Sequence, residues 1–107
     1  MLMPDTVNRY FHADRDNDVD ALLETFAAEA VVEDENASHR GTTAIREWWL
    51  AAKTATRYVA KPLESAMDED TVRVRAQVSG QFPGSPVMLT HAFAIKDNKI
   101  VRLEIRT

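Results

Sequence analysis

The chain has 107 residues, a formal net charge of −4 and no cysteine. Residues 1–107 therefore read as a single domain, whose core can bury somewhat more than about 60% of the unfolded surface and still leave room for a pocket. The negative charge disfavours a nucleic-acid partner, and the lack of thiols excludes disulfides, a thiolate nucleophile and a cysteine-based zinc site. No apolar run approaches the ~18 residues that span a bilayer, so we expect a cytoplasmic protein with no membrane partner.

The first third of the chain predicts two helices. Pro4 suits a first helical turn, and Val7 and Phe11 continue an apolar face at helical spacing. Asn17 or Asp18 can cap the second helix. Its apolar stripe consists of Val19, Leu22, Leu23 and Phe26.

A short strand and a third helix follow. Ala30–Asp34 has the apolar start of a buried strand, and the polar segment ENASHRG after it reads as a loop. Thr42 or Thr43 can begin a third helix that runs through Ile45 and the adjacent pair Trp48 and Trp49. Adjacent helical side chains point about 100° apart, so at most one of the two indoles lies squarely in the core and the other can line a cavity edge.

From Arg57 onward the sequence alternates with the period of antiparallel strands, and Asp68–Asp70, the segment FPGSP and Asp97-Asn98 supply the turns. The inward-facing set is Val72, Val74, Ala76, Val78, Val87, Leu89, His91, Phe93, Ile95, Val101, Leu103 and Ile105. The fold class we predict is α+β, with three N-terminal helices packed on one face of a curved, mostly antiparallel sheet.

Two polar residues fall on inward positions. His91 lies among large apolar neighbours, so it is either a core histidine satisfied by one hydrogen bond or a functional group. Asp34 shares the side of buried Val32, while Glu33 and Glu35 point away because strand side chains alternate. A carboxylate delivered into an apolar cavity is disfavoured as an anion, which suits a proton acceptor.

No metal site or cofactor is expected. Asp14, Asp16 and Asp18 resemble the start of a calcium loop, but Val19 occupies the position at which that loop needs glycine. The three histidines of the chain lie on three different predicted elements, and none of them has a convincing second ligand at helical spacing.

The segments RYFHADRDNDVDALLETFAAEAVVED and GTTAIREWW resemble the NTF2-like superfamily, in particular its ketosteroid isomerase and SnoaL-like polyketide cyclase branches. The resemblance covers nearly the whole chain and implies a cone-shaped fold that hosts many different reactions. It also implies that Tyr10, on the first helix, donates a hydrogen bond to an enolate oxygen and that Asp34 moves the proton.

Three positions depart from the isomerase pattern. His91 stands where the isomerases have a protonated carboxylic acid, and Asp14 stands where they tend to have an apolar pocket residue. Glu35 replaces a proline. A pocket that contains both an aspartate and a histidine resembles the cyclase branch, in which such groups abstract a proton from an activated methylene carbon and assist aldol ring closure.

Two functions remain open from the sequence. The first is a cofactor-free enzyme that transfers a proton next to a carbonyl. Its catalytic residues would be Asp34, Tyr10 and His91, and its ligand-binding residues Asp14, Trp49, Val74, Leu89, Phe93 and Leu103. The second is a non-catalytic binding or dimerisation module, in which the polar groups satisfy one another. Catalysis needs their tips to converge on open space, and the ligand would be a small apolar or carbonyl-containing molecule.

The outer face of the sheet predicts a homodimer. Its central strip is uncharged, and a monomer would leave it in contact with water. The residues of this face are Arg73, Arg75, Gln77, Met88, Thr90, Ala92, Ala94, Arg102 and Glu104.

Overall fold

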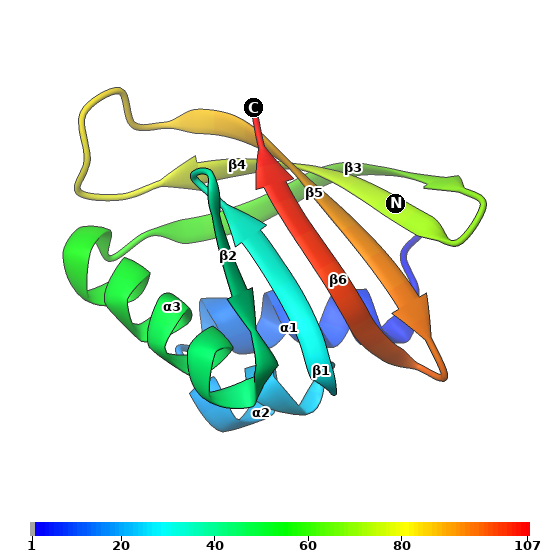
Figure 1. The fold of residues 1–107 in the computed structure, drawn as a ribbon. Coiled ribbons are helices and arrows are strands. Elements are labelled where there is room, and N and C mark those ends of the chain that lie inside the picture. The colour runs from blue at the N-terminus through cyan, green and yellow to red at the C-terminus, as the bar shows by residue number, and fades with distance from the viewer. Residues whose placement is uncertain (1) are drawn as a thin grey trace.

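A computed structural model describes residues 2–107 (Figure 1). In chain order the elements are α1 (Asp5–Arg15), α2 (Val19–Glu24), β1 (Phe26–Asp34), β2 (Ala37–Arg40), α3 (Gly41–Thr56), β3 (Val59–Asp68), β4 (Thr71–Ser79), β5 (Val87–Lys96) and β6 (Lys99–Arg106). The α+β class is confirmed. The helices are not all N-terminal, however, because α3 follows the first two strands.

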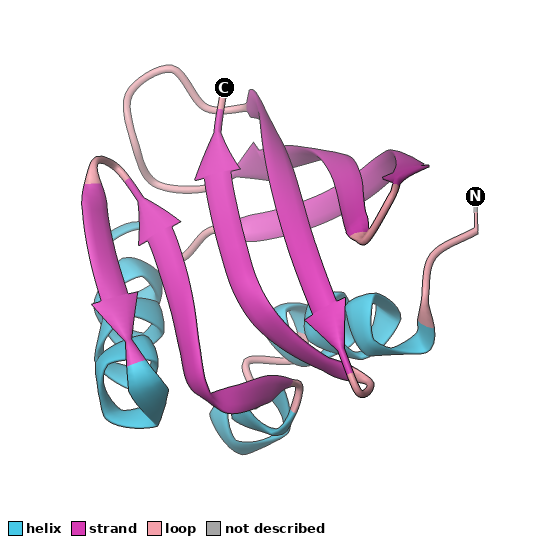
Figure 2. Ribbon diagram, turned by 45° about the vertical axis from the view of Figure 1, so that its right-hand side comes forward, coloured by secondary structure: helices cyan, strands magenta, loops and turns pink. Residues whose placement is uncertain are grey.

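The strands form one six-stranded sheet in the order β2-β1-β6-β5-β4-β3. Neighbouring strands are antiparallel except β1 and β6, which are parallel. Figure 2 shows how strongly the sheet curls, with the helices on its inner side. Helix α3 packs against β1 and β2, and α1 packs against β3. The curled sheet and the helices thus enclose the interior from two sides.

The helix ends have local causes. Of the two predicted caps of α2, Asp18 is the one used, because its Oδ1 accepts a hydrogen bond of 3.1 Å from the backbone N–H of Ala21. Helix α3 begins at Gly41, slightly before the predicted start. Gly41 has a φ of +86°, which a residue without Cβ adopts at little cost, so the chain turns from β2 directly into α3.

The first strand is longer than predicted, and a strand replaces the predicted polar loop. Phe26, assigned above to a helix stripe, begins β1 and pairs with Ile100 of β6. The segment Ala37–Arg40 forms β2, an edge strand paired antiparallel with β1, for example through His39 opposite Val32. Three of its four side chains are polar, because an edge strand is held by backbone hydrogen bonds and remains largely in solvent.

The predicted phase of β6 is wrong at its start. Ile100 and Leu103 are fully buried, whereas Val101, predicted to face inward, is only half-buried. The pairing of β5 with β6 shifts register between Ala94 and Ile95. A β-bulge that adds one residue to a strand reverses the side-chain alternation before it, which accounts for the difference.

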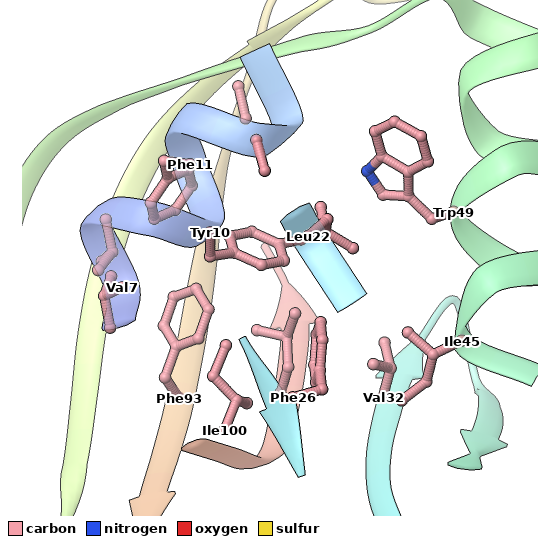
Figure 3. Packing of buried hydrophobic residues seen from close by; sticks show 14 of the residues in the cluster. Val7, Tyr10, Phe11, Leu22, Phe26, Val32, Ile45, Trp49, Phe93 and Ile100 are labelled. Carbon is pink, nitrogen blue, oxygen red and sulfur yellow. The ribbon is translucent and has the colours of Figure 1, made fainter. Parts of the chain in front are cut away.

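An aromatic cluster fills the centre of the core (Figure 3). The ring of Tyr10 makes edge-to-face contacts with Phe11, Phe26 and Phe93 at centroid distances of 5.2, 5.9 and 5.2 Å. Such pairs add about 0.5–1.5 kcal/mol each beyond the burial of area. This cluster fixes α1 against the sheet. None of the helices described within residues 2–107 is long and apolar enough to cross a membrane.

Candidate active site

A cavity of about 620 Å³ lies between α3 and the inner face of the sheet. Its apolar wall includes Leu89, Ile105 and Phe82, together with a row of alanines from α3. Its polar groups come from five separate segments of the chain, and they are Asp34, Glu35, His39, Thr56, Tyr58 and His91. An apolar pocket with a few converging polar groups is the form that small-molecule sites take.

Asp34 ends β1 and reaches this cavity. Val32 is fully buried on the same side of the strand, and Glu33 points to the outer face, where it pairs with Arg102 at 2.8 Å. The predicted direction of Asp34 is therefore confirmed, although Glu35, expected to point away, also lines the cavity at the turn. Trp48 Nε1 donates a hydrogen bond of 3.0 Å to Asp34 Oδ2 and holds the carboxylate in place.

His91 lies at the centre of β5, and only 4% of its surface is exposed. Its ring stacks beside Phe93 and meets the edge of Phe11 at centroid distances of 6.2 and 5.4 Å. Burial lowers the pKa of His91 to about 4, so the imidazole is uncharged at neutral pH. Within the described part of the chain, Nδ1 is buried without a hydrogen-bond partner. A buried polar atom without a partner is uncommon and calls for a ligand or water.

A second carboxylate, Asp14, is closed off from solvent beside this cavity. It is 1% exposed, and its Oδ1 accepts hydrogen bonds from Trp49 Nε1 at 2.9 Å and from the Tyr58 hydroxyl at 2.8 Å. Lys53 Nζ lies 3.5 Å from the same oxygen. Asp14 Oδ2 has no partner among residues 2–107. The side chain of Asp14 thus joins α1 to α3 and to Tyr58, the residue just before β3.

Lys53 completes this cluster. Its Nζ donates to the backbone oxygens of Asp14 and Tyr58 at 3.0 and 2.7 Å and lies 3.9 Å from the centroid of the Tyr58 ring. Burial lowers the pKa of Lys53, and the charge of Asp14 opposes that shift. Three partners hold the ammonium group in the wall between helix and sheet, so we assign it a structural role.

The sequence-predicted site residues divide into two groups. Asp34, His91 and Leu89 line the cavity. The remaining candidates lie in the packed interior behind it, and they are Tyr10, Asp14, Trp49, Val74, Phe93 and Leu103. Burial raises the pKa of Tyr10 well above its ordinary value, and the negative charges of Asp14 and Asp34 add to the effect, so its hydroxyl stays protonated.

Sequence reasoning missed several cavity and cluster residues. Trp48 lines the cavity and Trp49 lies in the core, which confirms the divergence of the two indoles and settles which is which. Lys53 lies one helical turn beyond Trp49 on the same face of α3, and that spacing could have revealed it. No comparable signal marks Tyr58, because the left-handed backbone at Arg57, with φ of +50°, sets its position.

A second hollow, of about 440 Å³, lies along the edge strand β3 and is lined by residues such as Leu2 and Met67. Its polar lining consists of Glu64 and Ser65. Its lining within residues 2–107 includes no histidine and no buried carboxylate, so this hollow lacks the groups that the larger cavity brings together.

Comparisons with known proteins agree with this geometry. A candidate polyketide cyclase from Sinorhizobium meliloti is 63% identical, with 97% of this chain and 95% of that chain covered and a TM-score of 0.96. A ketosteroid isomerase-like protein from Catenulispora acidiphila, solved in complex with trimethylamine, is 18% identical, with coverage of 99% and 87% and a TM-score of 0.86.

A third solved structure is SalBIII, an epoxide hydrolase/cyclase-like enzyme in pyran ring formation in the polyether salinomycin. It is 23% identical, with coverage of 97% and 93% and a TM-score of 0.83. The two more distant structures establish the fold alone. No curated protein matches the sequence.

A family profile described as a SnoaL-like domain matches residues 7–103, which is nearly the whole chain. The match includes Asp34, His91 and both tryptophans, and the near-complete overlap with the Sinorhizobium protein agrees with it. The chain therefore belongs to the SnoaL-like domain family.

Proposed function

We propose that this protein is an enzyme of isomerase or cyclase type that moves a proton next to a carbonyl group, with Asp34 as the base. The observation that carries the proposal is that Asp34 and His91 line one cavity while neither is bonded to the other among residues 2–107. A ligand in this cavity can contact both side chains, as the proposed catalysis requires.

The proposed chemistry uses few groups. Trp48 holds Asp34 Oδ2, and we assign the other carboxylate oxygen to the proton of the substrate carbon. The electron pair left behind moves onto the carbonyl oxygen, which accepts a hydrogen bond from a ring N–H of neutral His91. The enolate then either regains the proton at another carbon, which is isomerisation, or attacks a second carbonyl within the same molecule and closes a ring. In the second case the alkoxide formed from that carbonyl takes the proton back from Asp34.

We infer a packing role for Tyr10 in place of a direct contact with the substrate. Its ring is enclosed by Phe11, Phe26 and Phe93, and it is 2% exposed. Tyr58 does line the cavity, but its hydroxyl already donates to Asp14. His91 is therefore the donor that the proposal depends on.

One relative supports this class of reaction. The Sinorhizobium protein at 63% identity is a candidate polyketide cyclase. Ring closure by an enolate needs a base and an oxyanion donor in one apolar cavity, and Asp34 and His91 can supply both.

The test is hydrogen exchange at an activated methylene group. Ethyl benzoylacetate, an uncharged aryl β-keto ester, is followed by NMR in D₂O with and without the protein, at a pH where background exchange is slow. We expect the protein to accelerate exchange and Asp34→Asn to reduce the acceleration by at least ~10²-fold. The matched control is Glu33→Gln, which removes the adjacent carboxylate from the outer face and should leave the rate unchanged. Equal rates for the wild type and Asp34→Asn would refute the assignment of the base.

A non-catalytic binding protein is the second candidate. The observation that favours it is the bond from Trp48, since an indole donor also suits a carboxylate with a purely structural role. Saturable binding of the β-keto ester without accelerated exchange would select this alternative.

We also propose a homodimer through the outer face of the sheet. The central residues of this face, Met88, Thr90, Ala92 and Ala94, are partly buried already, and Arg75 donates a hydrogen bond of 2.9 Å to Thr90. Around them, Glu33, Arg102, Glu104 and Arg106 form an ion-pair network. An uncharged centre with a charged rim is the usual anatomy of an interface. Sedimentation velocity should show a dimer at micromolar concentration, and a monomer alone would refute the proposal.

A further inference from the structure

The charges around the cavity are of one sign. Asp34 and Glu35 line its wall, and its lining within residues 2–107 includes no lysine or arginine. The two histidines of the lining are His39 and His91. An anion that enters this cavity would approach two carboxylates and meet no permanent positive charge.

The nearest buried cation does not alter this balance. Lys53 lies behind the lining, where its ammonium group is 3.5 Å from Asp14 Oδ1 and donates to two backbone oxygens. Its charge is opposed by that of Asp14, and its hydrogen bonds are already used. A carboxylate group transferred from water into the cavity would therefore lose hydration without gaining a counter-ion.

The second and independent observation concerns His91. Its side chain lines the cavity, only 4% of it is exposed, and its Nδ1 is buried without a partner in the described chain. A neutral imidazole offers one donor and one acceptor. The imidazole that lines the cavity can therefore bond to a neutral polar group such as a carbonyl or hydroxyl.

We propose that the cavity is selective for substrate charge: it admits neutral or cationic carbonyl compounds, whose polar group bonds to His91, and it excludes anionic ones through Asp34 and Glu35. The inference rests on this cavity being the substrate site of the proposed function. It adds the class of substrate, which is a carbonyl compound that carries no carboxylate, sulfate or phosphate group.

The test uses three acetophenones that differ only in the para substituent. They are para-methylacetophenone, which is neutral, the para-trimethylammonio analogue, which is cationic, and para-acetylbenzoate, which is anionic. Binding is followed by two-dimensional NMR of the tryptophan indole N–H signals at pH 8, where an ordinary histidine is uncharged. Trp48 Nε1 bonds to Asp34 at the cavity and reports its occupancy, whereas Trp49 Nε1 bonds to Asp14 behind it and serves as the internal reference. Trp48→Phe assigns the two signals.

We expect the neutral and cationic ketones to shift the Trp48 signal with saturation, and the anion to bind at least ~10-fold more weakly than the neutral ketone. Salt at about 1 M shortens the Debye length to ~3 Å and should narrow that ratio. An anion that binds as tightly as the neutral ketone would overturn the proposal. A Trp48 signal that none of the three ketones moves would overturn it as well.

Two matched variants locate the source of the selectivity. Glu35→Gln removes a carboxylate from the cavity, and Glu33→Gln removes its neighbour from the outer face. The ratio of neutral to anionic affinity should shrink by about 3-fold in the first variant and stay unchanged in the second. If the ratio of neutral to anionic affinity is the same in both variants, Glu35 does not contribute to the charge selectivity, which would contradict the proposal.

These measurements are independent of turnover. Selective binding without proton exchange would refute the enzyme and leave the charge selectivity standing. If the protein instead catalyses proton exchange equally well on neutral and anionic β-keto compounds, the charge selectivity is refuted and the enzyme assignment stands.

Discussion

Two adjacent tryptophans of α3 each hold a carboxylate, and the two carboxylates have opposite surroundings. Trp49 donates to Asp14 at 2.9 Å and Trp48 donates to Asp34 at 3.0 Å. Asp14 also accepts from Tyr58, lies 3.5 Å from the ammonium group of Lys53 and is 1% exposed. Asp34 instead opens onto a cavity. The same type of hydrogen bond, from an indole to a carboxylate, thus belongs to a closed structural cluster at Asp14 and to a candidate reactive group at Asp34.

The difference shows that an indole bond does not by itself define the role of a carboxylate. Around Asp14 the ammonium group of Lys53 opposes the charge, and Trp49 and Tyr58 donate to Oδ1, so these bonds tie the carboxylate to the fold. Around Asp34 the cavity leaves one face for a ligand. The side chains of Trp48 and Trp49 leave α3 in directions about 100° apart, so each indole meets its carboxylate in a different environment.

The comparison is tested most strongly by removing each charge in turn. Asp14→Asn leaves Lys53 buried without its counter-ion and should lower the free energy of unfolding by about 3 kcal/mol. Asp34→Asn keeps an oxygen that can accept from Trp48 and relieves a partly buried charge, so it should change stability by less than about 1 kcal/mol. Urea unfolding of both variants measures the two losses. Similar losses would mean that the two carboxylates have the same role.

The pH dependence of stability sharpens the contrast at His91. Its folded pKa of about 4 lies below the ordinary value of 6.5, so the unfolded chain binds the proton more readily. The stability from this site is fully present above about pH 6.5 and is lost as the pH falls toward about 4, by up to about 3 kcal/mol.

Melting temperatures of the wild type and His91→Gln between pH 7 and 4 measure this effect. The variant lacks the titrating group, so its stability should fall less steeply over that range than that of the wild type. The exposed histidine of α1 supplies the matched control, and His12→Gln should keep the full slope of the wild type. Parallel curves for all three proteins would show that His91 is not buried in its neutral form.

Replacing each tryptophan by phenylalanine separates the two environments in a second way. Trp49→Phe removes a donor from a fully buried carboxylate and should cost about 2–3 kcal/mol. Trp48→Phe acts at the cavity, where water can replace the lost N–H, and should cost about 1 kcal/mol. Thermal unfolding ranks the two variants. A larger loss of stability for Trp48→Phe than for Trp49→Phe would contradict our assignment of Asp14 as the closed site and Asp34 as the open one.

The sequence predicted the parts of this molecule that depend on local pattern. Helix spacing and strand alternation located most elements, and the alternation in β1 placed Asp34 on the inner side next to Val32. The bulge that moves Ile100 into the core could not be predicted, because it depends on pairing with a distant strand. Strand β2 was missed because its polar side chains carry no alternation, and its hydrogen bonds come from the backbone.

The site was predictable only in part, for a related reason. Asp34 and His91 interrupt apolar patterns, so a single sequence reveals them. The Asp14 cluster depends on Lys53 and Tyr58, which reach the same carboxylate from separate elements. No local sequence pattern predicts that these side chains contact one another.

The smallest effect is expected at Tyr10, where the resemblance to the isomerases and the geometry disagree. A direct donor to the enolate would stabilise charge as it develops, and its removal typically costs about 10²-fold in rate. In this structure the ring is held among three phenylalanines, and Tyr10 does not belong to the cavity lining. Tyr10→Phe preserves the ring and its edge-to-face contacts, so exchange of the β-keto ester should change by less than about 3-fold. His91→Gln, measured beside it, should lose at least about 10-fold because it alters the donor that lines the cavity. A loss of about 10²-fold in Tyr10→Phe would instead place its hydroxyl at the reacting oxygen and make the site isomerase-like, with α1 supplying a catalytic group that the cavity lining does not include.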